Sequence, residues 1–313
     1  MKRKVIQLAH STAVISLPSK WVKKYGVKKG DEIEVGEEES RLIVTAEQTG
    51  SPKKQEIEVD MAGMAPRALM WTLVGLYRAG YDRIRILYDD TIQFEQIHLY
   101  VGNLLEGFQL TEEGKGYCVV ESVSKGMEAD FLPLFRKTLR LVSAMGQSSL
   151  EAIRNNDLQQ LKEVLVLEDT NNRLSILCER MLTKGACVPS NVKSYFFVMA
   201  WHSQKMCNLY RDLCRYLVEK QKLKLSKKLF ELYAYTNQVV QSYEEQYNHT
   251  EISRLVELFT ETRRRAMDVD IAVYSKEEQR VVFYLLSILH RVSDISTVLI
   301  GIHESLRQKK DLA

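Results

Sequence analysis

Residues 16–35 read SLPSKWVKKYGVKKGDEIEV and carry the turn signals of a small β-rich unit. Pro18 cannot continue the backbone pairing of a strand, so it ends the apolar run before it. Ser19 is a favourable N-cap for the short helix SKWVKKYG, which Gly26 closes. Gly30 then supplies a turn that leads into a second β segment. The stretch therefore predicts a short helix between two pairs of strands.

The flanking sequence supplies the strands. Residues 3–9 and 12–17 are expected to form the first two, and the segment carrying Ile33 and Val35 forms the third. SRLIVTA is expected to follow a turn at Gly36 and to form the fourth. A unit of this size buries too little apolar surface to be stable alone. Association of two copies would supply the missing core.

Charge is distributed unevenly along this segment. No acidic residue precedes Asp31, and six acidic residues lie between Asp31 and Glu39. The chain as a whole has a net charge of only +3, so the local distribution is more informative than the sum. The basic residues that crowd the first thirty positions are Lys2, Arg3, Lys4, Lys20, Lys23, Lys24, Lys28 and Lys29.

The Pro, Gly and Gly-Asp positions of residues 16–35 resemble the SpoVT/AbrB family of swapped-hairpin domains, and the resemblance extends over about residues 1–47. It implies a domain at residues 1–48 in which two chains form one intertwined β-barrel that binds DNA. Lysines and Arg3 would then contact phosphates, where release of counterions supplies most of the affinity. The DNA-binding residues expected on this basis are Lys2, Arg3, Lys4, Lys20, Lys23 and Lys24. Two alternatives stay open: these cations only solvate the barrel, or the domain serves as a dimerisation or antitoxin module.

Bulk composition is that of an ordinary globular protein, with 45% hydrophobic and 27% charged residues in 313. We see no apolar run of the 18–20 residues that span a bilayer and no secretory signal, so we expect a cytoplasmic protein without membrane insertion. None of the five cysteines forms a CxxC pair, which argues against a zinc site and favours buried thiols. Twelve of the fifteen glycines lie at or before Gly126, which indicates β structure in front and long helices behind.

Residues 54–125 predict a small α/β domain. EIEVD and DRIRILYD alternate as strands, and APRALMWTLVGLYRAG begins a helix at Pro66. TIQFEQIHLYVGNLLEG is a second helix, and FQLTEE and GYCVVESV flank a turn at Gly114–Gly116. The order is βαβαββ. The segment holds no phosphate loop or nucleophile, and either a spacer or a ligand-sensing role is open.

Residues 128–313 predict an all-α domain of six amphipathic helices, at 129–155, 157–184, 190–222, 225–248, 250–273 and 276–308. The last shows a heptad seam, the spacing typical of antiparallel bundles. Six helices fit one bundle or two three-helix bundles, and we favour two, at about 128–222 and 225–310. The seam residues are Val281, Leu285, Ile288, Val292, Ile295, Leu299, Ile302 and Leu306.

This layout resembles PhoU, a regulator of phosphate uptake built from two three-helix bundles. The resemblance implies carboxylate pairs at i,i+4 that hold iron, zinc or magnesium. Here amides stand at Gln204, Asn208 and Asn172, and amides bind metals weakly, so no cofactor is expected. The metal candidates that remain are Glu168, His290 and Asp294. For His290 and Asp294 the alternative is a solvated pair on the helix surface.

Taken together, the chain is expected to be a multidomain α+β protein and a homodimeric transcriptional regulator of phosphate uptake. The implied partners are DNA, a second copy and, through the PhoU-like part, the ATPase of a phosphate transporter or a sensor kinase. In the alternative, the front domain only dimerises the chain and the bundles bind the transporter or kinase. We find no paired catalytic acids, Ser/His/Asp grouping or nucleotide fingerprint, so no enzymatic activity is expected.

Overall fold

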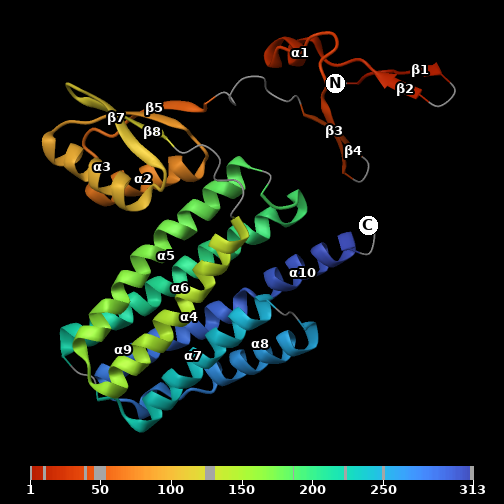
Figure 1. Ribbon diagram of the computed structural model, residues 1–313. Coiled ribbons are helices and arrows are strands. Elements are labelled where there is room, and N and C mark those ends of the chain that lie inside the picture. Colours follow the sequence, from red (N-terminus) through yellow and green to blue (C-terminus); the bar gives the residue numbers. More distant parts are fainter. Residues whose placement is uncertain are drawn as a thin grey trace. The chain divides into compact units, whose positions relative to one another are not determined.

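The computed structural model describes residues 2–9, 12–38, 41–45, 54–123, 131–185, 187–221, 224–248 and 251–310 (Figure 1). It consists of two compact units, Met1–Lys54 and Gln55–Ala313. The second unit contains both the predicted α/β segment and the predicted helical segment. The boundary expected between them, near residues 125–128, falls among residues 124–130, outside the described part, so that boundary stays a prediction.

The first unit has the predicted order of elements. Strand β1 (Val5–Ala9) pairs antiparallel with β2 (Thr12–Ile15), helix α1 spans Ser19–Tyr25, and β3 (Glu34–Glu38) pairs antiparallel with β4 (Arg41–Thr45). The two hairpins form separate two-stranded sheets. A β-barrel is not visible in the described part of the single chain.

Two local expectations in this unit are wrong. Pro18, and not Ser19, occupies the N-cap of α1, because its extended backbone (φ −62°, ψ 128°) directs the chain into the first turn without a side-chain cap. Gly36 lies inside β3 opposite Ile43, so the strand continues past the glycine to Glu38. At the other end of α1, Gly26 adopts a φ of 66° and closes the helix as predicted.

The α/β part of the second unit confirms the predicted βαβαββ order. Its elements are β5 (Glu56–Asp60), α2 (Pro66–Arg78), β6 (Arg83–Leu87), α3 (Thr91–Leu104), β7 (Phe108–Gly114) and β8 (Tyr117–Ser122). The sheet order is β5-β6-β8-β7, with β5 parallel to β6 and the other pairs antiparallel. Both helices cover the same face, where Ile84, Ile86 and Val120 share a core with Leu73 and Ile97 (Figure 1).

The helical part comprises α4 (Phe131–Asn155), α5 (Leu158–Lys184), α6 (Lys193–Lys220), α7 (Lys227–Asn248), α8 (Ile252–Met267), α9 (Lys276–Asp294) and α10 (Ser296–Lys310). Short 3-10 turns at Ser190–Val192 and Ile271–Val273 precede α6 and α9. The sixth predicted helix is thus divided at Ile295. There the N–H of Ile295 bonds to the carbonyl of Ser293, which also accepts a hydrogen bond from Ser296 Oγ.

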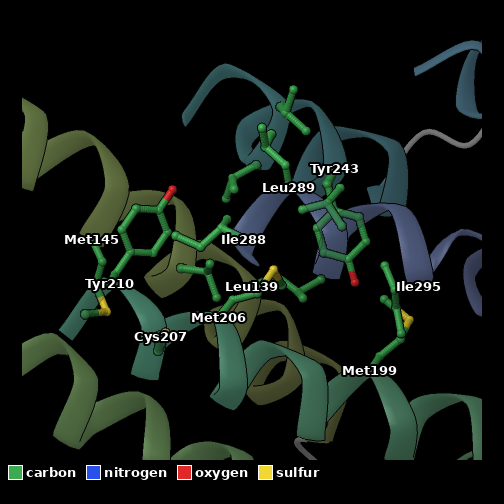
Figure 2. Packing of buried hydrophobic residues seen from close by; sticks show 14 of the residues in the cluster. Leu139, Met145, Met199, Met206, Cys207, Tyr210, Tyr243, Ile288, Leu289 and Ile295 are labelled. Carbon is green, nitrogen blue, oxygen red and sulfur yellow. The ribbon is translucent and has the colours of Figure 1, made fainter. Parts of the chain in front are cut away.

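The bundle has one continuous apolar core. Helices α4, α5 and α6 pack on one another, α7 and α8 pack on α9, and α4–α7 and α6–α9 contacts join the two groups. Figure 2 shows side chains of both groups converging, among them Leu139, Met206, Tyr210 and Ile288. Since a single cluster spans both groups, the division into two separate bundles stays a prediction.

The predicted heptad seam is confirmed, because Val281, Leu285, Ile288 and the seam residues through Ile302 are all buried. Lys276–Arg307 is also long and apolar enough, by length and composition, to cross a membrane. That feature differs from the expectation drawn from the sequence. The seam accounts for part of the apolar composition of this segment, since its residues lie in the bundle core.

Candidate nucleic-acid interface

The predicted DNA-contacting cations lie on two elements of the first unit. Lys2, Arg3 and Lys4 lie in the extended segment before β1, and all three are exposed. The other three lie on α1, where Lys20, Lys23 and Lys24 are exposed. Their spacing of i, i+3, i+4 brings them together on one face of the helix. The structure therefore places three of the six cations on one face of α1, and it leaves DNA contact a prediction.

The aromatic residues of α1 lie on another side of the helix. Trp21 and Tyr25 are half-buried, and their ring centroids are 5.2 Å apart. Lys24 Nζ lies 4.9 Å from the centroid of Tyr25, so the ammonium of this lysine makes a cation–π contact with the ring. The rings give the short helix its only aromatic packing within the described part of the unit. They leave the lysine face free for a ligand.

The acidic segment after α1 is locally ordered. Asp31 Oδ2 accepts a 2.7 Å hydrogen bond from the backbone N–H of Lys28, and Gly30 adopts a φ of 98° between them. The carboxylate of Asp31 therefore caps a turn. None of the six cations forms an ion pair with another described residue. Their charges are available to an anionic partner.

The first unit has no core of its own among the residues that the structure describes. No side chain of this unit whose burial the structure describes is buried, and several apolar residues of both hairpins face solvent. Leu8 is 70% exposed and Leu42 64% exposed. Contiguous exposed apolar residues on this scale are typical of a surface that a partner covers. The remaining exposed apolar residues of the hairpins are Val5, Ile6, Ile15 and Val35.

The metal candidates are not brought together. Glu168 is buried on α5, and its Oε1 accepts hydrogen bonds from Arg211 (2.8 Å) and Asn172 (2.6 Å). Burial raises the pKa of Glu168, while the Arg211 guanidinium opposes that rise. His290 and Asp294 are exposed on α9. Among the described residues, no group of three or more His, Cys, Asp or Glu side chains is arranged to hold a metal ion. Arg211 already neutralises the carboxylate of Glu168, and metal binding at the three candidates stays a prediction.

A buried polar junction in the second unit was missed by the sequence analysis. It joins α5 of the bundle to the end of α2, through Arg180 and Glu179. Arg180 Nη1 donates to the carbonyls of Tyr77 (2.7 Å) and Tyr81 (2.8 Å), and its Nη2 donates to Asp82 Oδ1 (2.8 Å). Adjacent charges inside the apolar stretch SILCERML, residues 175–182, were the signal that would have found it.

The same junction contains two carboxylates with different environments. Burial alone would raise the pKa of Asp82, but hydrogen bonds from Lys184 and from the N–H of Gln55 outweigh burial and lower it. Glu179 is fully buried and pairs with Arg78. Its burial raises the pKa to about 7, against the opposing effect of Arg78. The junction therefore holds one stabilised carboxylate and one that titrates near neutrality.

Comparison with known proteins shows one family similarity, over most of the first unit and the start of the second. The sequence model of the family described as antidote-toxin recognition MazE, bacterial antitoxin, matches residues 6–58. No curated protein and no solved structure matches the chain. The N-terminal segment is thus a MazE/AbrB-like swapped-hairpin domain, and it is followed by a mostly helical C-terminal part.

Proposed function

We propose that this chain is a DNA-binding regulator that acts as a homodimer through its MazE/AbrB-like segment. The observation that carries the proposal is the match of residues 6–58 to a family of this type. Domains of this kind typically dimerise and bind DNA. The exposed apolar residues of both hairpins support dimerisation, since a second copy would remove them from water.

The cationic residues support DNA as the partner. Lys20, Lys23 and Lys24 form one face of α1, and Lys2–Lys4 add a second basic segment in each chain. Two chains would double this charge at one interlocked domain. Lysines that neutralise phosphates release counterions, which supplies affinity for any duplex, whereas sequence preference needs contacts to base edges.

The helical part is proposed to receive the signal. Its helices resemble the layout of PhoU, and regulation of phosphate uptake is proposed on that resemblance alone. A transporter ATPase or a sensor kinase is the proposed partner of the bundle. Such a partner would act by binding one arrangement of the chain more tightly than another. The proposal includes a cytoplasmic location and no catalytic activity.

The test is duplex selection with the full chain from a random-sequence library at low salt. Lys20→Gln, Lys23→Gln and Lys24→Gln together should weaken binding to every duplex. The slope of the logarithm of the binding constant against the logarithm of the salt concentration should also become shallower, by about 0.9 for each phosphate that the protein no longer neutralises. The matched control removes three exposed lysines of the helical part, Lys220, Lys227 and Lys228, for the same change in charge. Failure of the folded dimer to retain any duplex would overturn the proposal.

A second candidate is an antitoxin-like or interaction role, in which the first unit dimerises the chain and the chain binds a protein. The description of the matched family, antidote-toxin recognition, favours it. An antitoxin-like protein and a protein-interaction regulator of a transporter or kinase should both bind a protein partner. In either case the partner should still be recovered with the chain after nuclease treatment. Enrichment of specific genomic sites across the same cells would support the DNA-binding role instead.

A further inference from the structure

Trp201 on α6 lies close to two cations that form no ion pair with a carboxylate of the described residues. Lys205 Nζ is 5.2 Å and Arg291 Cζ 5.7 Å from the centroid of the indole ring. Lys205 is one turn along α6, and Arg291 comes from α9, which packs on α6. The ring is 36% exposed, so the cluster opens to solvent. We call Trp201, Lys205 and Arg291 the cation–indole cluster.

The charge around this cluster is unbalanced. Burial lowers the pKa of Lys205, and the nearby cations Arg78, Arg291 and Arg211 lower it further, with Glu179 opposing. Glu179 is already paired with Arg78. Glu168 and Asp212 form ion pairs with Arg211, so their carboxylates are not free to neutralise Lys205 or Arg291. Lys205 and Arg291 therefore carry the excess positive charge.

A buried imidazole beside the cluster lacks a hydrogen-bond partner. His202 is 9% exposed, its ring centroid lies 5.4 Å from that of Trp201, and its Nδ1 bonds to no atom of the described chain. Burial and then Arg291 lower the pKa of His202, with Asp294 opposing. A buried polar atom without a partner is costly unless a ligand or water satisfies it. Asp294 is exposed one turn along α9, and no ion pair joins it to Arg291 within the described residues.

We propose that the cation–indole cluster, together with His202, is a binding site for a small oxyanion of the phosphate class. An ammonium and a guanidinium that both lie beside one indole ring offer charge-assisted hydrogen bonds to such an anion. The oxyanion supplies the negative charge that the cluster lacks, and its oxygens accept from Lys205 and Arg291. The site lies in the second unit and is independent of the proposed DNA contacts in the first.

The site also adjoins the junction with α2. Arg78 pairs with Glu179 and donates to Gln204 Oε1 at 3.1 Å, next to Lys205 in the sequence of α6. An anion bound at Lys205 therefore changes the electrostatic potential at Glu179, the junction carboxylate that titrates near neutrality. Binding would alter how firmly α2 is held to α5, which gives the ligand a route to the α/β part.

The experiment uses the full chain with Trp21 and Trp71 replaced by Phe, so that Trp201 is the sole tryptophan of the three. Its emission is titrated with inorganic phosphate and separately with glycerol 3-phosphate, each against chloride at equal ionic strength. A saturable change with either anion is expected. Tighter binding of one of the two identifies the source, free phosphate or a phosphate ester, and both outcomes support the site.

Lys205→Gln and Arg291→Gln should each weaken binding by about tenfold, the loss of one charge-assisted hydrogen bond. Arg215→Gln, an exposed position on the same helix, should leave it unchanged. Titration calorimetry on the wild-type chain detects binding that does not change the tryptophan emission. Absence of saturable signal by both methods, or equal affinity in all three variants, overturns the proposal.

Discussion

Arg180 and Asp82 form a buried ion pair, with Nη2 and Oδ1 2.8 Å apart, that ties helix α5 to the loop before β6. The guanidinium also lies 4.8 Å from the ring centroids of both Tyr77 and Phe108. One arginine of the bundle thus donates hydrogen bonds to two backbone carbonyls and a carboxylate of the α/β part, and it makes cation–π contacts with two of its aromatic rings. The contact joins the α/β part to the helical part, and residues 55–313 form one compact unit.

We expect Arg180→Met to destabilise the second unit strongly. The change leaves two carbonyls without this donor and leaves Asp82 with Lys184 as its remaining cation, and each buried group left unsatisfied typically costs about 1–3 kcal/mol. Arg140→Met is the matched control, because Arg140 is exposed and lies 3.9 Å from Glu244, so its loss should change stability by about 0.5 kcal/mol or less. Urea unfolding monitored by circular dichroism measures both. Similar midpoints for the two variants would contradict the structural role of Arg180.

Glu179 should make stability depend on pH between about 4.5 and 7. Its pKa rises from 4.5 to about 7 on folding, so the folded state holds the proton more tightly than the unfolded state. The contribution is fully present below pH 4.5 and is lost as the pH rises through 7. At about 1.4 kcal/mol per unit of pKa, the change is on the order of 3 kcal/mol.

The measurement is the difference in unfolding free energy between the wild type and Glu179→Gln across this range. The amide does not titrate, so the variant should lose the dependence. Glu151→Gln, an exposed position on α4, should keep it. Parallel curves for the wild type and Glu179→Gln would show that Glu179 stays ionised in the folded state, held by Arg78.

Leu8→Glu should dissociate the proposed dimer. Leu8 is 70% exposed in the single chain, and a swapped-hairpin dimer would bury it. A carboxylate there would have to be desolvated or kept apart from the partner. Thr12→Glu is the control, at an exposed position at the turn end of the same hairpin. Sedimentation velocity should give a monomer for Leu8→Glu and a dimer for Thr12→Glu. A wild-type chain that sediments as a monomer at micromolar concentration removes the basis of the prediction.

Gly146→Ala and Gly102→Ala should change stability in opposite directions. A Cβ at Gly146 in α4 would lie 2.8 Å from both Asn237 Oδ1 and Tyr210 Oη, which are hydrogen-bonded to each other at 2.8 Å. We expect a loss of about 1–3 kcal/mol from overpacking. Gly102 in α3 has nothing within 4 Å, so alanine should stabilise by about 0.4–1 kcal/mol. Thermal unfolding of both variants checks the signs, and a tolerated Gly146→Ala would mean that Asn237 is free to move.

The regular elements were predictable because they rest on local chemistry. Pro66 at the start of α2, the φ of 93° at Gly80 and the alternation of Ile84 and Ile86 each encode an element within a few residues. The interruption at Ile295 was not predictable. The heptad continues through it, and the Ser293 hydroxyl bonds to the carbonyl of Phe259 on another helix. The helix that carries Lys20, Lys23 and Lys24 was predicted from its own proline and glycine, and DNA contact by these lysines stays a prediction.

The sequence by itself determined the order of elements in the first unit and the α/β part, the apolar seam of the last helical segment and the clustering of basic residues near the N-terminus. Each depends on the spacing of residue types along the chain. Only the tertiary structure decided which charges are buried and with what partner, as for Glu168 with Arg211 and Glu179 with Arg78. The reason is physical: the cost of burying a charge is set by groups that arrive from other helices, and no local pattern records which ones they are.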